Sequence, residues 1–131
     1  MWSLLPVPSG RLSVVTIPRP ERGEVWWVNW SPGRGSEHTG NRPALVVQTD
    51  PANHNPQYPN TIVTTLSTKG RNVPSHVRID PTAENGLTAP SFIKCEQLLT
   101  ISKARLEKRM GRISPNDLER VVTALRIVLE L

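Results

Sequence analysis

Short apolar runs broken by turn residues at close intervals are the feature that most limits how this chain can fold. β-Branched and aromatic residues favour strands, whereas Pro and Gly end them. Turn signals stand at Ser31-Pro32-Gly33, Asp50-Pro51, Asn55-Pro56, Asp80-Pro81 and Asn85-Gly86. The pattern predicts strands over residues 24–30, 44–48, 61–66, 76–79, 91–98 and 106–113. Strands this short and closely spaced favour a small antiparallel barrel, so the predicted fold class is mainly β.

One segment departs from this pattern and predicts a C-terminal helix. Ser114 is a favourable N-cap, Pro115 suits the first helical position, and Asp117 suits the first turn. Apolar residues then recur at spacings of three and four, at Leu118, Val121, Val122, Leu125, Val128 and Leu129. Such a stripe packs against a core. We expect this helix to be structural and to close the barrel or support a dimer.

The chain has the length of a single domain. Its 131 residues can bury one core but are too few for two. Residues 1–20 are rich in proline, and we expect them to form a tail outside a core domain of residues 21–131. No apolar stretch approaches the length of about 18 residues that spans a membrane. Cys95 is the single cysteine, which fits a protein of the reducing cytoplasm.

An excess of positive charge favours a polyanionic partner. The 16 Lys and Arg residues outnumber 11 Asp and Glu residues, which gives a net charge of +5. Nucleic acid and an acidic peptide both suit this charge, and charge alone does not choose between them. Part of the excess lies in a run that is either a solvated face or an electrostatic track, formed by Lys103, Arg105, Lys108, Arg109 and Arg112.

The segment between the first two predicted strands carries the strongest chemical signal. It is a glycine-rich loop that presents Ser36, Glu37 and Arg42. Pro43, expected at the first position of the second strand, restricts Arg42 to extended backbone angles. A guanidinium offers a planar fork of donors to two phosphoryl oxygens and stays charged. Arg42 is therefore the first candidate for binding a phosphate, and Glu37 either acts in the same site or orients Arg42 through an ion pair.

A second group of polar residues stands where the third predicted strand ends. Ser67 and Thr68 precede a basic stretch that contains Lys69 and Arg71. Hydroxyl groups at this point can hold a phosphate or help to move a proton. The plainer alternative is a turn that the Ser67 side chain caps.

A third group lies on the strand predicted over residues 91–98. Lys94 and Glu96 are two positions apart, so the period of a strand places them on one face and Cys95 on the other. A cation and a carboxylate presented together can act as an acid and base pair, or each can simply form a cross-strand ion pair. Cys95 is expected to be a small core side chain, because no base is paired with it.

The histidines do not suggest a metal site. His38, His54 and His76 are scattered, with no cysteine or carboxylate cluster beside them, so we expect neither zinc nor magnesium nor any other cofactor. If the polyanionic partner is RNA, it carries its own nucleophile, the 2′-hydroxyl. A protein that cleaves RNA need only remove the proton of this hydroxyl, neutralise the charge of the phosphorane and protonate the departing 5′-oxygen.

Two stretches of sequence together match a known family. Residues 22–30 read R-G-E-V-W-W-V-N-W, and residues 35–43 read G-S-E-H-T-G-N-R-P. They resemble the MazF/PemK toxins of type II toxin–antitoxin modules, in which R-G-(D/E)-φ-W-φ-V is followed by G-x-E-x-x-G-x-R-P. The likeness continues through residues 61–68, 73–77 and 94–97.

The resemblance implies a fold, an activity and partners. The fold is an SH3-like (PemK/CcdB-type) antiparallel barrel with a C-terminal helix, usually in a homodimer. The activity is sequence-selective, metal-independent cleavage of single-stranded RNA that leaves 2′,3′-cyclic phosphate and 5′-hydroxyl ends. The partner is an acidic, MazE-like antitoxin that inactivates the enzyme.

Chemistry and resemblance together suggest a role for each candidate residue. We expect catalytic roles for Arg42, Ser67, Glu37 and Glu96, and RNA binding by Thr68, Lys94, Lys69, Arg71 and Ser36. The family has Thr-Thr or Thr-Ser where this chain has Ser67-Thr68, with the first residue essential, so the departure leaves open which hydroxyl carries the role. The Kid/PemK branch has a catalytic Arg-x-Asp where this chain has Lys94-x-Glu96, and Lys94 lacks the bidentate fork of arginine.

Two functions of other classes remain open at the level of sequence. The chain is alternatively a non-catalytic binding module, or a gyrase poison like the CcdB relatives that share this fold. Neither alternative requires Arg42, Ser67 and Glu96 to meet in one groove, whereas the ribonuclease does. The placement of these three side chains therefore discriminates between the functions.

Overall fold

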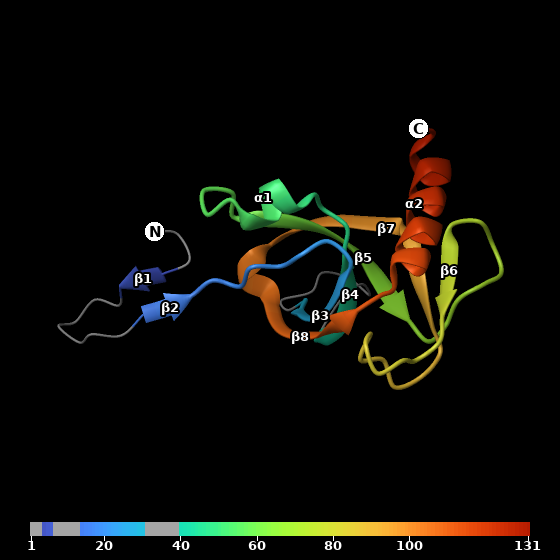
Figure 1. The fold of residues 1–131 in the computed structure, drawn as a ribbon, viewed down its shortest axis with the longest axis horizontal. Coiled ribbons are helices and arrows are strands. Elements are labelled where there is room, and N and C mark those ends of the chain that lie inside the picture. Colours follow the sequence, from blue (N-terminus) through green and yellow to red (C-terminus); the bar gives the residue numbers. More distant parts are fainter. Residues whose placement is uncertain (1–3, 7–13, 31–39) are drawn as a thin grey trace.

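The structure is a computed structural model that describes residues 4–6, 14–30 and 40–131. Its main element is an antiparallel sheet of six strands in the order β6-β7-β5-β4-β3-β8 (Figure 1). The strands are β3 (Glu24–Asn29), β4 (Asn41–Val46), β5 (Asn60–Ser67), β6 (His76–Ile79), β7 (Ser91–Ser102) and β8 (Leu106–Arg112). Near the N-terminus, β1 (Leu4–Pro6) pairs with β2 (Val14–Thr16) in a separate two-stranded sheet. The mainly β prediction is confirmed, and all six predicted strands are present.

The sheet curls without closing through strand pairing. Strands β6 and β8 are its two edges, and a loop that follows β6 approaches β8. The backbone N–H of Arg112 donates to the carbonyl of Glu84 at 2.8 Å. Gly111 makes this approach possible, because a Cβ there would stand 2.2 Å from the Glu84 carbonyl oxygen. The predicted barrel is therefore a strongly curved sheet whose edges are joined through a loop.

Apolar side chains form two clusters in the core. The larger one lies under the helix α2 (Pro115–Leu129) and joins Val121 and Ala124 of this helix to Leu45 and Ile93 of the sheet. The second cluster includes Trp26 and other residues of β3, β4 and β5. In β4, for example, Leu45 belongs to the first cluster and its neighbours Ala44 and Val46 belong to the second, as a strand period of two requires.

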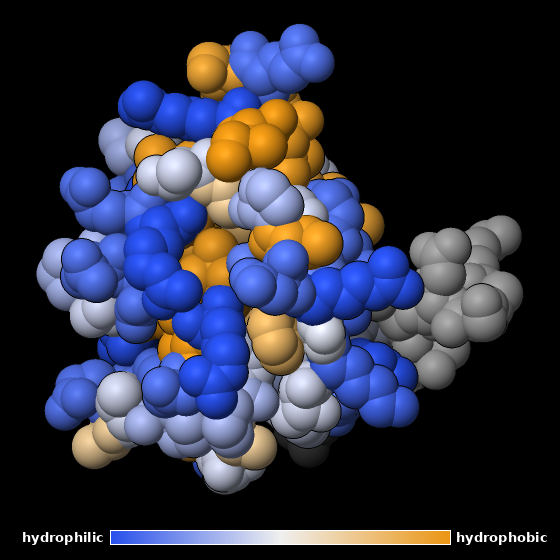
Figure 2. All heavy atoms as spheres, turned by 90° about the vertical axis from the view of Figure 1, so that its right-hand side faces the viewer, coloured by the Kyte–Doolittle hydropathy of each residue, from blue (hydrophilic) through white to orange (hydrophobic). Residues whose placement is uncertain are grey.

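The C-terminal helix begins as the sequence predicts. The Ser114 side chain accepts a hydrogen bond from the backbone N–H of Asp117 at 3.1 Å. The predicted apolar stripe is only partly buried, because Leu129 is 48% exposed. Together with Ile127 and Leu131 it leaves an apolar patch at the surface, and Figure 2 shows apolar side chains gathered over the end of α2. No helix in the described ranges is long and apolar enough to cross a membrane.

The structure differs from the prediction mainly at three places, and several other strand ends shift by one or two residues. The turn expected at Asp50-Pro51 is instead the short helix α1 (Asp50–His54), since an acidic residue and a proline also suit a first helical turn. Strand β7 continues past residue 98 to Ser102. Strand β4 begins at Asn41, so Pro43 is its third residue, and the ladder with β5 begins only at Ala44. A missing backbone N–H is therefore tolerated at Pro43.

Candidate active site

A groove on one face of the sheet brings together candidate residues that are far apart in sequence. Strand β5 lies between β4 and β7, with Thr65 opposite Ala44 on one side and Lys94 on the other. The groove has a volume of about 540 Å³. It is lined by Trp30, Arg42, Thr65, Leu66, Ser67, Lys94, Glu96, Gln97, Leu98 and Leu99. Arg42, Ser67, Lys94 and Glu96 therefore converge, as the ribonuclease prediction requires.

Arg42 stands at the start of β4, opposite Val28 of β3. The backbone N–H of Trp30 donates to the carbonyl of Gly40 at 2.9 Å, and Gly40 has a φ of 71°, a conformation that glycine adopts readily. This contact fixes the point at which the chain enters β4. The Arg42 side chain is exposed, and within the described part of the chain it pairs with no carboxylate. Arg42 therefore lines the groove without a counter-ion among the described residues.

Ser67 ends β5 beside Arg42, and the two residues also line a second hollow of about 290 Å³. The Ser67 hydroxyl oxygen accepts a hydrogen bond from the backbone N–H of Lys69 at 3.1 Å, so the turn cap suggested by the sequence is present. A hydroxyl that accepts one bond still has its proton to donate. Thr68 is exposed and lines only the second hollow.

A bulge in β7 places Glu96 and Gln97 at the groove, whereas Cys95 between them and Lys94 is buried in the core. Thr64 lies opposite Leu98, and the next residue, Thr65, lies opposite Lys94, so residues 95–97 have no partner on β5. Bulges of this kind redirect side chains. The Thr65 hydroxyl donates to Oε1 of Gln97, which leaves the two amide N–H groups of Gln97 to act as donors. Gln97 is a groove residue that sequence reasoning did not select, although it stands in the matched stretch 94–97.

The partner of Glu96 is a histidine. The Nε2 atom of His76 lies 2.9 Å from Oε2 of Glu96, and no ion pair of Lys94 occurs among the described residues. Partial burial raises the pKa of Glu96, but hydrogen bonds from His76 and Ser75 outweigh it and hold the pKa below its usual value. Glu96 is therefore a carboxylate at neutral pH. Of the cross-strand pairs that the sequence allowed for Lys94 and Glu96, Glu96 makes one, with His76 of β6, and Lys94 makes none among the described residues.

His76 is the second residue that the sequence did not single out. Its Nδ1 atom accepts a hydrogen bond from the backbone N–H of Arg71 at 3.0 Å. The side chain is only 9% exposed. His76 thus connects the basic loop after β5 to the carboxylate on β7. Its place in the matched stretch 73–77 was the available signal.

The remaining candidates are placed as follows. Lys69 and Arg71 are exposed on the loop after Ser67 and do not line the groove. Ser36 and Glu37 lie outside the described residues.

No group of three or more His, Cys, Asp or Glu side chains that could hold a metal ion occurs in the described ranges. Burial raises the pKa of Cys95 to about 11, with a smaller contribution from the charge of Glu96, so the thiol is a poor nucleophile.

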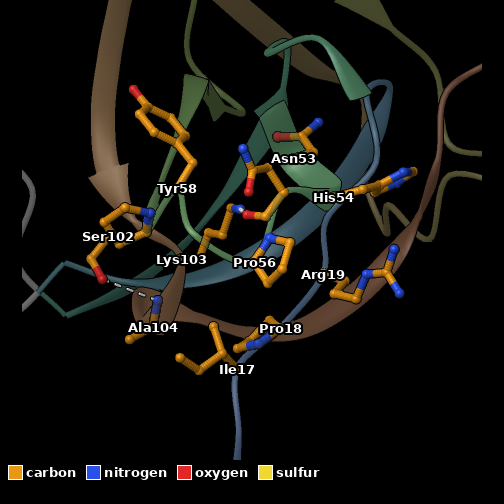
Figure 3. Close-up of a pocket in the computed structure, with 12 residues that line it drawn as sticks. Ile17, Pro18, Arg19, Asn53, His54, Pro56, Tyr58, Ser102, Lys103 and Ala104 are labelled. Atoms are coloured by element: carbon orange, nitrogen blue, oxygen red, sulfur yellow. Dashed lines mark hydrogen bonds between the residues drawn. The ribbon is translucent and has the colours of Figure 1, made fainter. Parts of the chain in front are cut away.

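A third hollow lies at the other end of β5, close to α1 (Figure 3). Lys103, in the 3₁₀-helix η1 (Lys103–Arg105), extends into its wall and donates to the carbonyls of Ala52 and Asn55 at 3.1 and 3.2 Å. Burial lowers the pKa of Lys103, and the charge of Arg19 adds to this effect. Lys103 thus caps the C-terminal end of α1. None of the predicted site residues lines this hollow.

The rest of the C-terminal cationic run is also partly structural. Arg109 pairs with the buried carboxylate of Glu24 at 2.5 Å, and Arg112 pairs with Glu21 at 2.5 Å. These contacts, with the burial of Lys103, show that the run is not simply a solvated face. Neither is it an uninterrupted positive track.

Comparisons of the sequence with known proteins show its family. The profile of the family described as "PemK-like, MazF-like toxin of type II toxin-antitoxin system" matches residues 21–129. Endoribonuclease MazF of Staphylococcus epidermidis is 34% identical over 113 residues, which cover 84% of this chain and 91% of that protein. Endoribonuclease EndoA of Bacillus subtilis (strain 168) is 34% identical over 111 residues, which cover 85% of this chain and 95% of that protein.

Solved structures support the same fold. An endoribonuclease in complex with its cognate antitoxin, from mycobacterial species, gives a TM-score of 0.71 at 24% identity and covers 86% of this chain and 96% of its own. MazF (Form-I) from Deinococcus radiodurans gives a TM-score of 0.71 at 19% identity and covers 87% and 99%. From the family profile and the two sequence relatives, together with this fold, the chain belongs to the PemK-like, MazF-like toxins of type II toxin–antitoxin systems.

Proposed function

We propose that this chain is the toxin of a toxin–antitoxin module and a sequence-selective, metal-independent endoribonuclease that cleaves single-stranded RNA. The observation that carries the proposal is the convergence of Arg42, Ser67 and Glu96 in one groove. The sequence relatives named as endoribonucleases support it. The proposed functional domain is residues 21–131, with residues 1–20 as a tail, and the family profile begins at residue 21.

Arg42 and Ser67 act on the phosphate. The Arg42 guanidinium binds two phosphoryl oxygens and stabilises the charge that grows on them as the 2′-oxygen attacks. The Ser67 hydroxyl donates a hydrogen bond to a phosphoryl oxygen while its oxygen continues to accept a hydrogen bond from the backbone N–H of Lys69. Thr68, Lys69, Arg71 and Ser36 bind the RNA strand, and Glu37 either acts directly in the catalytic site or orients Arg42.

Glu96 and Lys94 act on the proton and on the remaining charge. Glu96 is a carboxylate and accepts the proton of the 2′-hydroxyl. Its lowered pKa makes it a weak base, so its contribution depends on accurate placement beside that hydroxyl. Lys94 neutralises phosphoryl charge as a point cation. The bond from phosphorus to the 5′-oxygen breaks, that oxygen takes a proton from water, and the products are a 2′,3′-cyclic phosphate and a 5′-hydroxyl.

A non-catalytic binding module and a gyrase poison are not favoured. Either would use this fold, but neither explains why a guanidinium, a hydroxyl and a carboxylate from three strands meet at one groove. The proposed location of the protein is the cytoplasm, where it would meet an RNA substrate.

Cleavage without a metal tests the proposed function directly. Purified protein in excess EDTA is expected to cut a long RNA at one short, defined sequence, because the RNA supplies the nucleophile and the protein supplies the charges. Primer extension maps the cuts, and end-group analysis identifies the cyclic phosphate. Cleavage that requires added magnesium, or cuts without sequence preference, would contradict the proposal.

The two neighbouring hydroxyls are expected to differ in effect. Ser67→Ala should lower kcat more than Thr68→Ala, because Ser67 lines the groove and Thr68 does not. Steady-state cleavage of a short RNA with each variant makes the comparison, with thermal unfolding to confirm the fold. A larger loss of kcat with Thr68→Ala would contradict this prediction and would identify the hydroxyl of Thr68 as the essential one.

The exposed apolar patch and the net charge suggest the assembly. We expect a homodimer, since Ile127, Leu129 and Leu131 leave apolar area at the surface. Because the chain carries a net positive charge, we also expect it to bind an acidic MazE-like antitoxin that folds as it binds and displaces RNA. Light scattering at micromolar concentration should give the dimer mass, and titration of an acidic antitoxin segment should release labelled RNA. A monomer mass, or antitoxin binding with RNA retained, would contradict this assembly.

A further inference from the structure

His76 makes two hydrogen bonds that together favour one tautomer of its ring. A backbone N–H of Arg71 can only donate, so Nδ1 of His76 accepts and carries no proton. In a neutral imidazole the proton is then on Nε2. Nε2 faces Oε2 of Glu96 at 2.9 Å, and a carboxylate can only accept. Both contacts are therefore satisfied by a single tautomer.

The contacts join Glu96 in the groove to a neighbouring loop with which it has no strand pairing. On one side is the basic loop that contains Lys69 and Arg71, and on the other is Glu96 in the bulge of β7. The loop also packs on Phe92, because a Cβ at Gly70 would lie 2.2 Å from the Phe92 ring. The Phe92 and His76 ring centroids are 6.3 Å apart. The imidazole thus lies between the loop, the strand and an aromatic ring, with little freedom to turn.

We propose that His76 is a positioning residue of the RNA cleavage reaction, which holds the Glu96 carboxylate through Nε2 and the basic loop through Nδ1. The inference rests on the proposed function, because the two groups it holds are the proposed base and part of the proposed RNA-binding loop. The Glu96 side chain is 42% exposed, so without the hydrogen bond to His76 its bonds would rotate freely in water. The bond from His76 restricts it to one orientation toward the groove.

Two substitutions separate the halves of this role. In His76→Asn, the side-chain oxygen can replace Nδ1 as the acceptor for Arg71, but nothing reaches Glu96. In His76→Gln, the amide nitrogen can replace Nε2 as the donor to Glu96, but the loop loses its acceptor. The matched control is His54→Gln, which changes a histidine that pairs with Glu21 at 3.5 Å outside the groove.

The kinetic results should divide in the same way. His76→Asn is expected to lower kcat by on the order of a hundredfold, the cost of a misplaced catalytic group, with little change in KM. His76→Gln is expected to keep kcat near that of the wild type and to raise KM. In the Glu96→Ala background, His76→Asn should lower kcat no further, because His76 acts through Glu96. His54→Gln should leave both constants unchanged.

A measurement of the tautomer gives an independent test in the unmodified protein. Long-range ¹H–¹⁵N correlation spectra should show His76 as the Nε2–H form, and the Nδ1–H form would overturn the proposal. Equal losses of kcat in the Asn and Gln variants, or a further loss of kcat from His76→Asn without Glu96, would also overturn it. A wild-type protein that cleaves no RNA would instead overturn the proposed function, and an active wild type with a fully active His76→Asn variant would remove only the role of His76.

Discussion

Arg42→Ala is expected to lower kcat for RNA cleavage by about a hundredfold or more, the usual cost of losing one preorganised donor to transition-state charge. The substitution removes the guanidinium that lines the groove beside Ser67. It leaves the core intact, because the Arg42 side chain is exposed. We therefore expect the loss to appear in kcat while the thermal unfolding temperature stays unchanged.

Two further variants make the Arg42 result interpretable. Arg42→Lys keeps the charge but loses the planar fork, so we expect only partial recovery. Arg78→Ala is the matched control, because Arg78 is also an exposed arginine and pairs with Asp80 at 2.9 Å on the edge strand β6. Loss of one positive charge there should leave kcat unchanged. Equal losses at Arg42 and Arg78 would assign the effect to net charge and not to the groove.

The sequence predicted the strands because their apolar periodicity is local. It also predicted the start of α2, where Ser114 and Asp117 form the cap that the structure contains. It did not predict α1, since Asp50-Pro51 suits a turn and a helix equally well. Nor did it predict the bulge in β7, because a bulge depends on the register between two strands and not on either strand alone.

In the candidate site, too, the features set by local sequence were predicted and those set by contacts between distant segments were not. Arg42, Ser67, Lys94 and Glu96 could be selected from residue chemistry and resemblance, and the structure brings them into one groove. The partner of Glu96 could not be deduced, because His76 is twenty positions away and reaches it only through the pairing of β6 with β7. Lys103 was misjudged for a related reason. A basic run suggests a solvated face, but tertiary contacts bury this lysine against the end of α1.

The largest effect is expected from a change in the substrate. A 2′-deoxy nucleotide on the 5′ side of the cut removes the nucleophile itself, so cleavage at that position should be abolished, whereas the loss of any one side chain leaves the other groups in place. Gel analysis of a labelled oligonucleotide with a single deoxy position measures this. The matched control carries the deoxy nucleotide on the 3′ side of the cut and should be cleaved.

This experiment distinguishes the mechanism from hydrolysis by water. In a nuclease that activates water, the water molecule is the nucleophile that attacks phosphorus, so the loss of one 2′-hydroxyl would not stop cleavage. Cleavage of the substituted strand would therefore contradict the mechanism even if the enzyme were fully active in EDTA. The substituted strand should still bind, since Arg42 and Lys94 contact phosphate and not the sugar in the proposed complex. A strand that binds with unchanged affinity but is not cut would locate the defect in the chemical step, where the loss of a nucleophile must appear.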